Sequence, residues 1–289
     1  MNRLRHCRRL CLSTAAMMAF LAGADLAVAW PPVPLAQSSP EGQKRGAPNT
    51  RQDAPAEKAD GQQDGPRSYM GRPIADVMSW QGAEWLFRET RIDEEQPEAM
   101  LRALKIPRGA TVADVGAGAG YHSVRLARRV GPTGTALATD VQPEMLEMLR
   151  NNAREAGVAN IKRILATQSD TKLPVAKVDL ILMVDVYHEC SQPETMLNGF
   201  FTALKPGGRL VLVEFRGEDP EVPIKPEHKM TLKQVRREVE PRGFVFKESL
   251  EFLPWQHVII FEKPAAPKKD STPAPKQPPP VAREPKSHE

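Results

Sequence analysis

The sequence contains little cysteine and few aromatic residues. Only three of its 289 residues are cysteines, and 6% are aromatic. Two of the cysteines, Cys7 and Cys11, lie in the first 29 residues, which leaves Cys190 alone in the rest of the chain. A single cysteine can form neither a disulfide within that part of the chain nor a cysteine-based metal site, so both are excluded there.

The chain also lacks a strong charge of either sign. Its net charge is +4, and the first 29 residues contribute four arginines and a single aspartate to that value. The remainder is therefore nearly neutral, and we expect no nucleic-acid partner. His228 and His257 stand apart along the chain without metal-ligand spacing, so we predict no metal site and a structural role for both.

The first 29 residues have the pattern of a secretory signal peptide. Arginines precede an apolar stretch at residues 10–22, and the small-residue sequence AVA ends at Ala29. Cleavage there would make Trp30 the first residue of an exported, periplasmic or extracytoplasmic protein with no stable membrane span. The alternative is an uncleaved membrane anchor, although Asp25 interrupts the apolar stretch, which is short for a span. The arginine pair at 8–9 matches a twin-arginine signal only poorly.

Two flanking segments contain few large apolar residues. Residues 30–67 are rich in proline, glutamine, glycine and charge, and residues 264–289 combine proline with lysine, serine and alanine. Such segments bury too little apolar surface to offset the loss of chain entropy on folding. We predict a disordered linker and a disordered tail around one domain at residues 68–263, which is long enough to form a large core.

Strand-like and helix-like patterns alternate within residues 68–263. Helices are expected at 76–87, 96–104, 123–130, 142–156, 193–204 and 231–239, and strands at 111–115, 134–139, 161–165, 178–186 and 209–215. Two final runs, 244–252 and 257–262, are joined by a few residues and predict an antiparallel hairpin. The alternation predicts an α/β fold with a doubly wound, mostly parallel, seven-stranded Rossmann-like sheet that ends in this hairpin.

The sequence VADVGAGAGYHS, residues 112–123, places three glycines directly after the first strand of that alternation. Gly116, Gly118 and Gly120 permit a sharp turn and the close approach of a ligand, and the following helix offers free N–H groups. In such sheets a ligand binds beyond the carboxyl ends of the strands. The pattern predicts a nucleotide-like ligand, against the alternative of a purely structural turn.

Two residues bear on the identity of that ligand. A dinucleotide fingerprint requires glycine where this sequence has Tyr121, which counts against a nicotinamide cofactor. Asp140 ends the second strand of the alternation, where a carboxylate accepts hydrogen bonds from both hydroxyls of a ribose. NAD sites use the same device, so Asp140 alone does not discriminate. The alternative role of Asp140 is to cap the helix that begins near Gln142.

Four segments resemble, in order and spacing, the motifs of class I S-adenosylmethionine-dependent methyltransferases. These segments are VADVGAGAGYHS, ALATD, VDLILMVDVYHE and ALKPGGRLVLVEFRGEDP. The resemblance covers residues 70–264 and is nearest to bacterial methyltransferases of the type 11 or UbiE-like kind, including exported ones. It implies transfer of a methyl group from S-adenosylmethionine to an acceptor that is a small molecule or a lipid-like compound.

The resemblance also implies roles for particular residues. Asp114 and the glycine turn would hold the methionine part of the cofactor, Asp140 would bind the ribose, and Val141 would pack on the adenine. Asp170 falls where the family often contacts the adenine amino group, although capping a turn is the alternative. Asp185, which closes the fourth strand, would lie near the sulfonium and the acceptor, or would serve only as a structural acid.

Methyl transfer requires the acceptor to be aligned and, where necessary, deprotonated. His188 follows the fourth strand and is the candidate catalytic base, because an imidazole titrates near neutral pH. The alternative is an ordinary hydrogen-bonded loop histidine, and Cys190 beside it is expected to be buried rather than nucleophilic.

Two other functions stay open from the sequence. One is a non-catalytic module that binds S-adenosylmethionine or its product, and the other is a nicotinamide-dependent oxidoreductase that binds NAD. The sequence indicates no particular oligomeric state.

Overall fold

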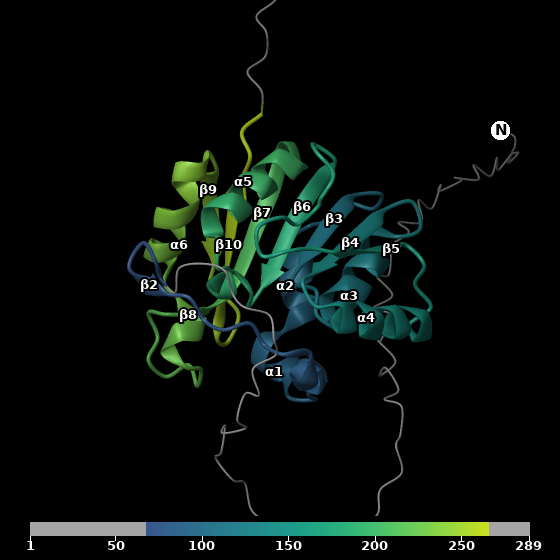
Figure 1. Cartoon of the computed structure of the whole chain (residues 1–289), viewed down its shortest axis with the longest axis horizontal. Coiled ribbons are helices and arrows are strands. Elements are labelled where there is room, and N and C mark those ends of the chain that lie inside the picture. Colours follow the sequence, from purple (N-terminus) through teal and green to yellow (C-terminus); the bar gives the residue numbers. More distant parts are fainter. Residues whose placement is uncertain (1–67, 266–289) are drawn as a thin grey trace, which may run out of the picture. The chain divides into compact units, whose positions relative to one another are not determined.

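A computed structural model describes residues 68–265, and its central element is a mixed sheet (Figure 1). The strands are β3 (Thr111–Val115), β4 (Thr135–Asp140), β5 (Ile161–Leu165), β6 (Val178–Val184), β7 (Leu204–Arg216), β8 (Lys229–Met230), β9 (Val245–Leu250) and β10 (Gln256–Glu262). They lie in the order β5-β4-β3-β6-β7-β10-β9, and the short β8 pairs with β7. The strands from β5 to β7 in this order are parallel, whereas β10 is antiparallel to both β7 and β9. The predicted α/β fold with a C-terminal hairpin is confirmed.

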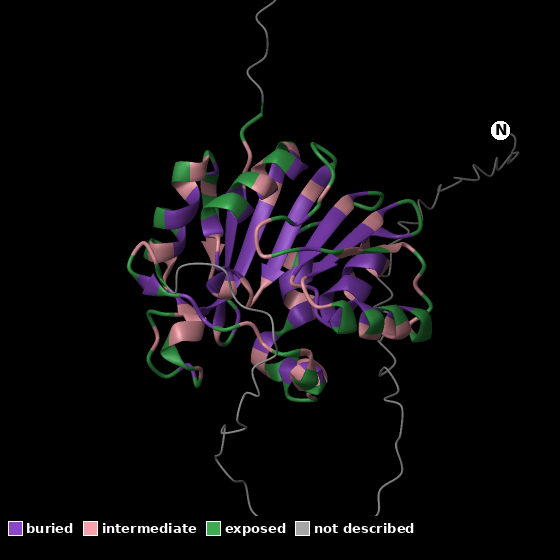
Figure 2. Ribbon diagram, viewed as in Figure 1, coloured by how far each residue is buried: buried purple, intermediate pink, exposed green. Residues whose placement is uncertain are grey.

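Helices connect the strands and cover both faces of the sheet. They are α1 (Arg91–Glu95), α2 (Pro97–Ala103), α3 (Tyr121–Val130), α4 (Pro143–Glu155), α5 (Pro193–Ala203) and α6 (Leu232–Val239), with short 3-10 helices η1 (Trp80–Phe87), η2 (Tyr187–Glu189), η3 (Pro226–His228) and η4 (Glu240–Arg242). Successive side chains of a strand point to opposite faces. Leu180 of β6 packs in one core cluster with Leu126 of α3, and its neighbour Ile181 packs in another with Leu197 of α5. The central strands are consequently buried on both sides (Figure 2).

Two of the predicted elements begin several residues away from the expected position. The helix expected at 76–87 is the 3-10 helix η1, which begins only at Trp80, because the Gln142 side chain accepts from the Trp80 N–H at 2.8 Å and donates to the Met78 carbonyl at 3.0 Å. Strand β7 begins at Leu204 rather than 209. The end of β10 explains this, because Lys263 exchanges two backbone hydrogen bonds of 2.8 Å with the glycines of KPGG.

An N-terminal pair of short strands, β1 (Ser68–Tyr69) and β2 (Arg72–Pro73), precedes the sheet. The guanidinium of Arg72 contacts the Glu238 carboxylate of α6 with its Nε at 2.7 Å and its Nη2 at 3.1 Å. Its Nη1 donates to the His188 carbonyl at 3.0 Å, and the Tyr187 hydroxyl donates to Glu238 at 2.8 Å. This buried network ties the start of the domain to α6 and to the segment after β6.

Several predicted segments lie outside the described residues. These are the signal segment 1–29, the linker 30–67 and residues 266–289 of the tail. Among residues 68–265, none of the helices has the length and apolar character that a membrane crossing requires.

Candidate active site

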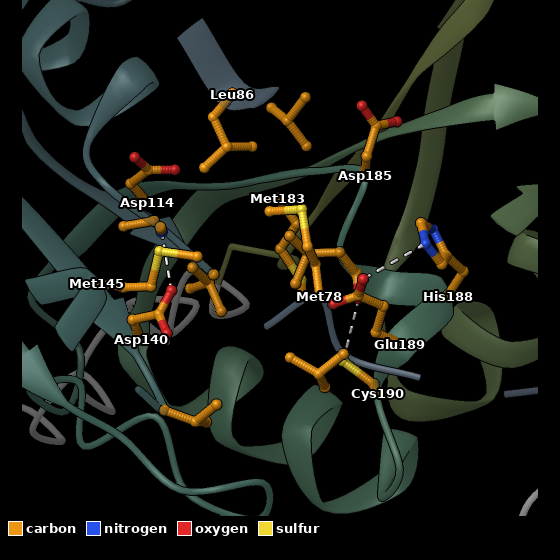
Figure 3. A pocket seen from close by; sticks show the side chains of 18 of the residues that line it. Met78, Leu86, Asp114, Asp140, Met145, Met183, Asp185, His188, Glu189 and Cys190 are labelled. Atoms are coloured by element: carbon orange, nitrogen blue, oxygen red, sulfur yellow. Dashed lines mark hydrogen bonds and ion pairs between the residues drawn. The ribbon is translucent and has the colours of Figure 1, made fainter. Parts of the chain in front are cut away.

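A cavity of about 420 Å³ lies at the carboxyl ends of β3, β4, β6 and β7 (Figure 3). The glycine turn after β3 forms one part of its lining, and Asp140 follows from the end of β4. Asp185 comes from the end of β6, and His188 from η2 directly after it. The fold thus brings together residues from separate strand ends, at the edge of the sheet where such folds bind their ligands.

The glycine turn is held against the end of β4. The backbone N–H groups of Gly116 and Ala117 both donate to the Thr139 carbonyl, at 2.9 and 3.0 Å. Gly116 has a φ of +70°, in the left-handed region that favours glycine. A Cβ atom there would also lie 2.5 Å from Cγ1 of Val186. Glycine is therefore required at this position both by the backbone conformation and by its surroundings.

Asp140 connects the glycine turn to the start of α4. Its Oδ2 accepts from the Gly118 N–H at 2.8 Å, and its Oδ1 accepts from the Gln142 N–H at 2.9 Å. Burial raises the pKa of this carboxyl, although both hydrogen bonds oppose the shift. Each carboxylate oxygen has a second lone pair, so Asp140 can still accept hydrogen bonds from a ribose. Val141 lines the cavity beside it.

Asp114 is buried beneath the glycine turn and also lines the cavity. The Ser123 hydroxyl donates to its Oδ2 at 2.5 Å. The pKa of Asp114 is raised to about 6. Burial is the main cause, the Ser123 hydrogen bond acts in the opposite direction, and the charge of Asp140 adds to the rise. Asp114 and Asp140, the two acids predicted to contact the cofactor, therefore both adjoin the glycine turn.

Four buried polar atoms of the cavity lining have no hydrogen-bond partner within the described chain. They are Tyr121 Oη, His122 Nδ1, Thr139 Oγ1 and Asp185 Oδ1. Leaving such an atom buried and unsatisfied costs about 1–3 kcal/mol. Their gathering around one cavity fits a bound molecule with several polar groups, as the predicted S-adenosylmethionine has.

Asp185 occupies an unusual backbone position at the end of β6, with a φ of +54°. Its Oδ2 accepts from the Gln256 side chain at 2.6 Å. Burial, followed by the charges of Glu95 and Glu214, raises the pKa of Asp185 well above its ordinary range. Protonation of Asp185 is therefore easier than that of an exposed aspartate.

His188 is oriented by a buried glutamate. Its Nδ1 lies 2.6 Å from Glu214 Oε2, and Glu214 Oε1 accepts from the Tyr187 N–H at 2.8 Å. A carboxylate only accepts, so Nδ1 carries a proton, and in the neutral imidazole the lone pair is on Nε2. Burial disfavours the imidazolium, but the charge and hydrogen bond of Glu214 outweigh burial and raise the pKa of His188. The role of His188 as a catalytic base stays a prediction.

His228 lies next to His188, and the sequence-based interpretation missed this proximity. The ring nitrogens His228 Nδ1 and His188 Nε2 are 3.0 Å apart, although 40 residues separate the two histidines in the chain. Glu189 completes a group of three, with Oε1 at 4.0 Å from His188 Nε2. Burial raises the pKa of Glu189 to about 7. The expectation that His228 stands apart is corrected, because η3 and β8 return the chain to the end of β7.

Asp170 is not among the residues that line the cavity. It is exposed, and its Oδ1 accepts from the Lys172 N–H at 2.8 Å, so it caps a turn. The adenine contact implied for it has no support from this geometry, and Thr167 and Gln168 line the cavity instead. Cys190 is buried, as expected, and burial raises the pKa of its thiol to about 12, so it stays protonated.

Comparison with known proteins identifies the fold and its chemistry. The family described as a methyltransferase domain matches residues 106–256, more than half of the chain. The ubiquinone/menaquinone biosynthesis C-methyltransferases UbiE of Citrobacter koseri and Salmonella arizonae are each 33% identical over 111 residues, 38% of this chain and 44% of theirs. The chain thus spans less than half the length of these relatives.

A solved structure agrees with the family match. A S-adenosylmethionine-dependent methyltransferase from Aquifex aeolicus superposes with a TM-score of 0.62 and 25% sequence identity, over 65% of this chain and 100% of that one. The glycine turn, the two acids beside it and the unsatisfied polar atoms fit the cofactor of that family. The chain therefore belongs to the class I S-adenosylmethionine-dependent methyltransferases, and S-adenosylmethionine is its cofactor.

Proposed function

We propose that the chain methylates a small acceptor that has an extended apolar part, of quinone-like or lipid-like chemistry. The observation that carries the proposal is the division of the cavity lining between two ends. Asp114 and Asp140 lie on one side of the cavity and Asp185 and His188 on the other (Figure 3), and the apolar Phe215 and Ile224 also belong to its lining. The name of the UbiE relatives, which places them in ubiquinone and menaquinone biosynthesis, supports an acceptor of this kind.

The residues of the chain bind and orient both molecules. S-adenosylmethionine supplies an electrophilic methyl group on a positively charged sulfur. Asp140 and Asp114 would hold its polar parts beside the glycine turn. The apolar side chains of Met183, Val186 and Phe215 line the space between the strand ends, where they exclude water and favour an apolar acceptor. Alignment of the acceptor atom is the main contribution that such a site makes to the rate.

The cofactor assignment can be tested by calorimetric titration of the full chain with S-adenosylmethionine, S-adenosylhomocysteine and NAD. We expect binding of the two sulfur compounds only. Asp140→Ala should weaken it by about 100-fold or more, because hydrogen bonds to a charged group contribute about 1.5–3 kcal/mol each. The matched control is Asp170→Ala, whose exposed side chain should matter by no more than about twofold.

Other results of the same titration would contradict the assignment. Binding of NAD alone would place the chain among the oxidoreductases. Binding of S-adenosylmethionine without methylation of any member of a quinone-like and lipid-like acceptor panel, followed by mass spectrometry, would favour the non-catalytic module.

We further propose that the protein is exported, on the pattern of residues 1–29 alone. Fractionation of cells that express the full chain, with mass spectrometry of its N-terminus, tests this. A mature protein that begins at Trp30 outside the cytosol is expected. An intact chain confined to the cytosol would contradict export.

A further inference from the structure

The group His188, Glu189 and His228 has the composition and spacing of a metal-binding site. Its nearest ligand atoms from each residue all lie within 4.8 Å of one another. At metal–nitrogen distances of about 2.0–2.1 Å, two adjacent ligand atoms lie about 2.8–3.0 Å apart at a right angle and about 3.3–3.4 Å apart at a tetrahedral angle. The observed separation of His188 Nε2 and His228 Nδ1 is 3.0 Å. Glu189 Oε1, at 4.0 Å from Nε2, needs to approach by roughly 1 Å to complete the group.

The orientation of His188 is the one that a metal ligand requires. Its Nδ1 donates to the buried Glu214 carboxylate at 2.6 Å, which leaves the lone pair of Nε2 available. Histidines that bind metals commonly donate their other ring N–H to a carboxylate or carbonyl in this way. Glu214 is fully buried and also accepts from the Tyr187 N–H, so its position is fixed on both sides.

His228 is held in place independently. It ends η3 and directly precedes β8, whose residue Lys229 pairs with Phe215 of β7. The rings of His188 and His228 meet edge to face, with centroids 5.0 Å apart and an angle of 86° between their planes. In this arrangement His188 Nε2 and His228 Nδ1 are brought to within 3.0 Å of one another. Both segments that carry ligand atoms are therefore anchored on the same strand, which reduces the reorganisation that binding would need.

We propose that His188, Glu189 and His228 bind a divalent first-row transition-metal ion at the acceptor end of the cavity. Two imidazoles and one carboxylate suit zinc, iron, cobalt or nickel rather than magnesium. Three protein ligands leave coordination positions open, and all three residues line the cavity. An acceptor that carries an oxygen can occupy an open position and is thereby oriented. When His188 Nε2 binds a metal, its lone pair can no longer accept a proton. This inference therefore replaces the catalytic-base role of His188.

The experiment measures metal binding without the cofactor. The full chain is equilibrated at pH 8 with Zn²⁺, Co²⁺ or Mg²⁺, the metal content is determined by mass spectrometry, and visible absorption reports the coordination of Co²⁺. We expect one Zn²⁺ or Co²⁺ per chain, a Co²⁺ absorption band and no retained Mg²⁺. His228→Ala and Glu189→Gln should abolish the band, and Glu214→Gln should weaken binding by about 10–100-fold.

Matched variants keep the result decisive. His257→Gln removes a histidine outside the group and should leave both stoichiometry and band unchanged. Circular dichroism verifies that each variant is folded. If a variant fails to fold, the proposal is judged on the metal stoichiometry and the Co²⁺ band of the wild type. Absence of binding, or binding that persists in His228→Ala and Glu189→Gln, would overturn the proposal. Because no S-adenosylmethionine is present, this failure is distinct from a failure of the proposed methyl transfer.

Discussion

Asp114 is a buried acid whose charge opposes folding. Its folded-state pKa of about 6 lies above its ordinary value of 3.8, so the folded chain holds this proton more tightly than the unfolded chain. Its contribution to stability is fully present below pH 3.8 and is lost as the pH rises through 6. Asp114→Asn cannot titrate. Its free energy of unfolding relative to the wild type should therefore rise between pH 4 and 7.5, by up to about 3 kcal/mol.

Denaturant unfolding of the cofactor-free chain at several pH values measures this difference. Ser123→Ala provides the companion variant, because the Ser123 hydroxyl lowers the pKa of Asp114. Its loss should move the pH window upward. A difference between Asp114→Asn and wild type that is the same at every pH would refute the interpretation.

Local pattern was sufficient to find some site residues but not others. Asp114, Asp140 and Asp185 each lie within one residue of the end of an apolar strand, so alternation alone places them at one edge of the sheet. His228 has no such offset, and its approach to His188 depends on the pairing of β8 with β7 across many residues. Asp170 does not reach the cavity because its side chain caps a local turn. From the sequence, capping a turn and contacting the adenine were both open for this residue.

At the scale of elements, the glycine turn after β3 should be intolerant of side chains. Gly116→Ala combines a positive φ with a Cβ contact of 2.5 Å to Val186. We expect about 1 kcal/mol from the backbone conformation and a further 1–3 kcal/mol, roughly, from overpacking. Binding of S-adenosylmethionine should weaken in parallel. Thermal unfolding and calorimetric titration measure the two effects.

Gly157 offers a matched control for this substitution. It closes α4 with a φ of +67°, but a Cβ there would have no heavy atom within 4 Å. Gly157→Ala should therefore show only the conformational part, about 1 kcal/mol, and normal cofactor affinity. Equal losses in the two variants would show that the contact with Val186 has no effect.

The order of elements was predictable because both faces of the sheet are covered by helices. Parallel strands buried on two sides are continuous apolar runs, and amphipathic helices separate them. The boundaries that failed, at η1 and at the start of β7, are set by partners distant in sequence, namely Gln142 and Lys263. A local pattern carries no information about such partners.

At the scale of the whole molecule, Arg72 joins the start of the domain to α6 through a buried ion pair. Arg72→Met leaves the fully buried Glu238 carboxylate without its cation. Breaking such a pair from one side destabilises a protein by about 3–5 kcal/mol. Urea unfolding should show this loss, and the double variant Arg72→Met/Glu238→Met should recover part of it.

The junction of α6 and η4 contains a control pair. Arg236 of α6 and Glu240 of η4 also form an ion pair, at 2.7 Å, but both side chains are partly exposed to solvent. Arg236→Met should cost less than about 1 kcal/mol. If Arg72→Met costs no more than Arg236→Met, the buried pair does not hold the domain together as we infer.

One wall of the cavity is supplied by η1, α1 and the residues just before η1. Met78, Leu86 and Arg91 line the cavity, yet they precede residue 106, where the match to the methyltransferase family begins. The matched range carries both the glycine turn and His188, and the segment before it adds a further wall to the same cavity. Substitutions at Met78 or Leu86 can therefore reshape the space for the acceptor without changing any residue of the matched range.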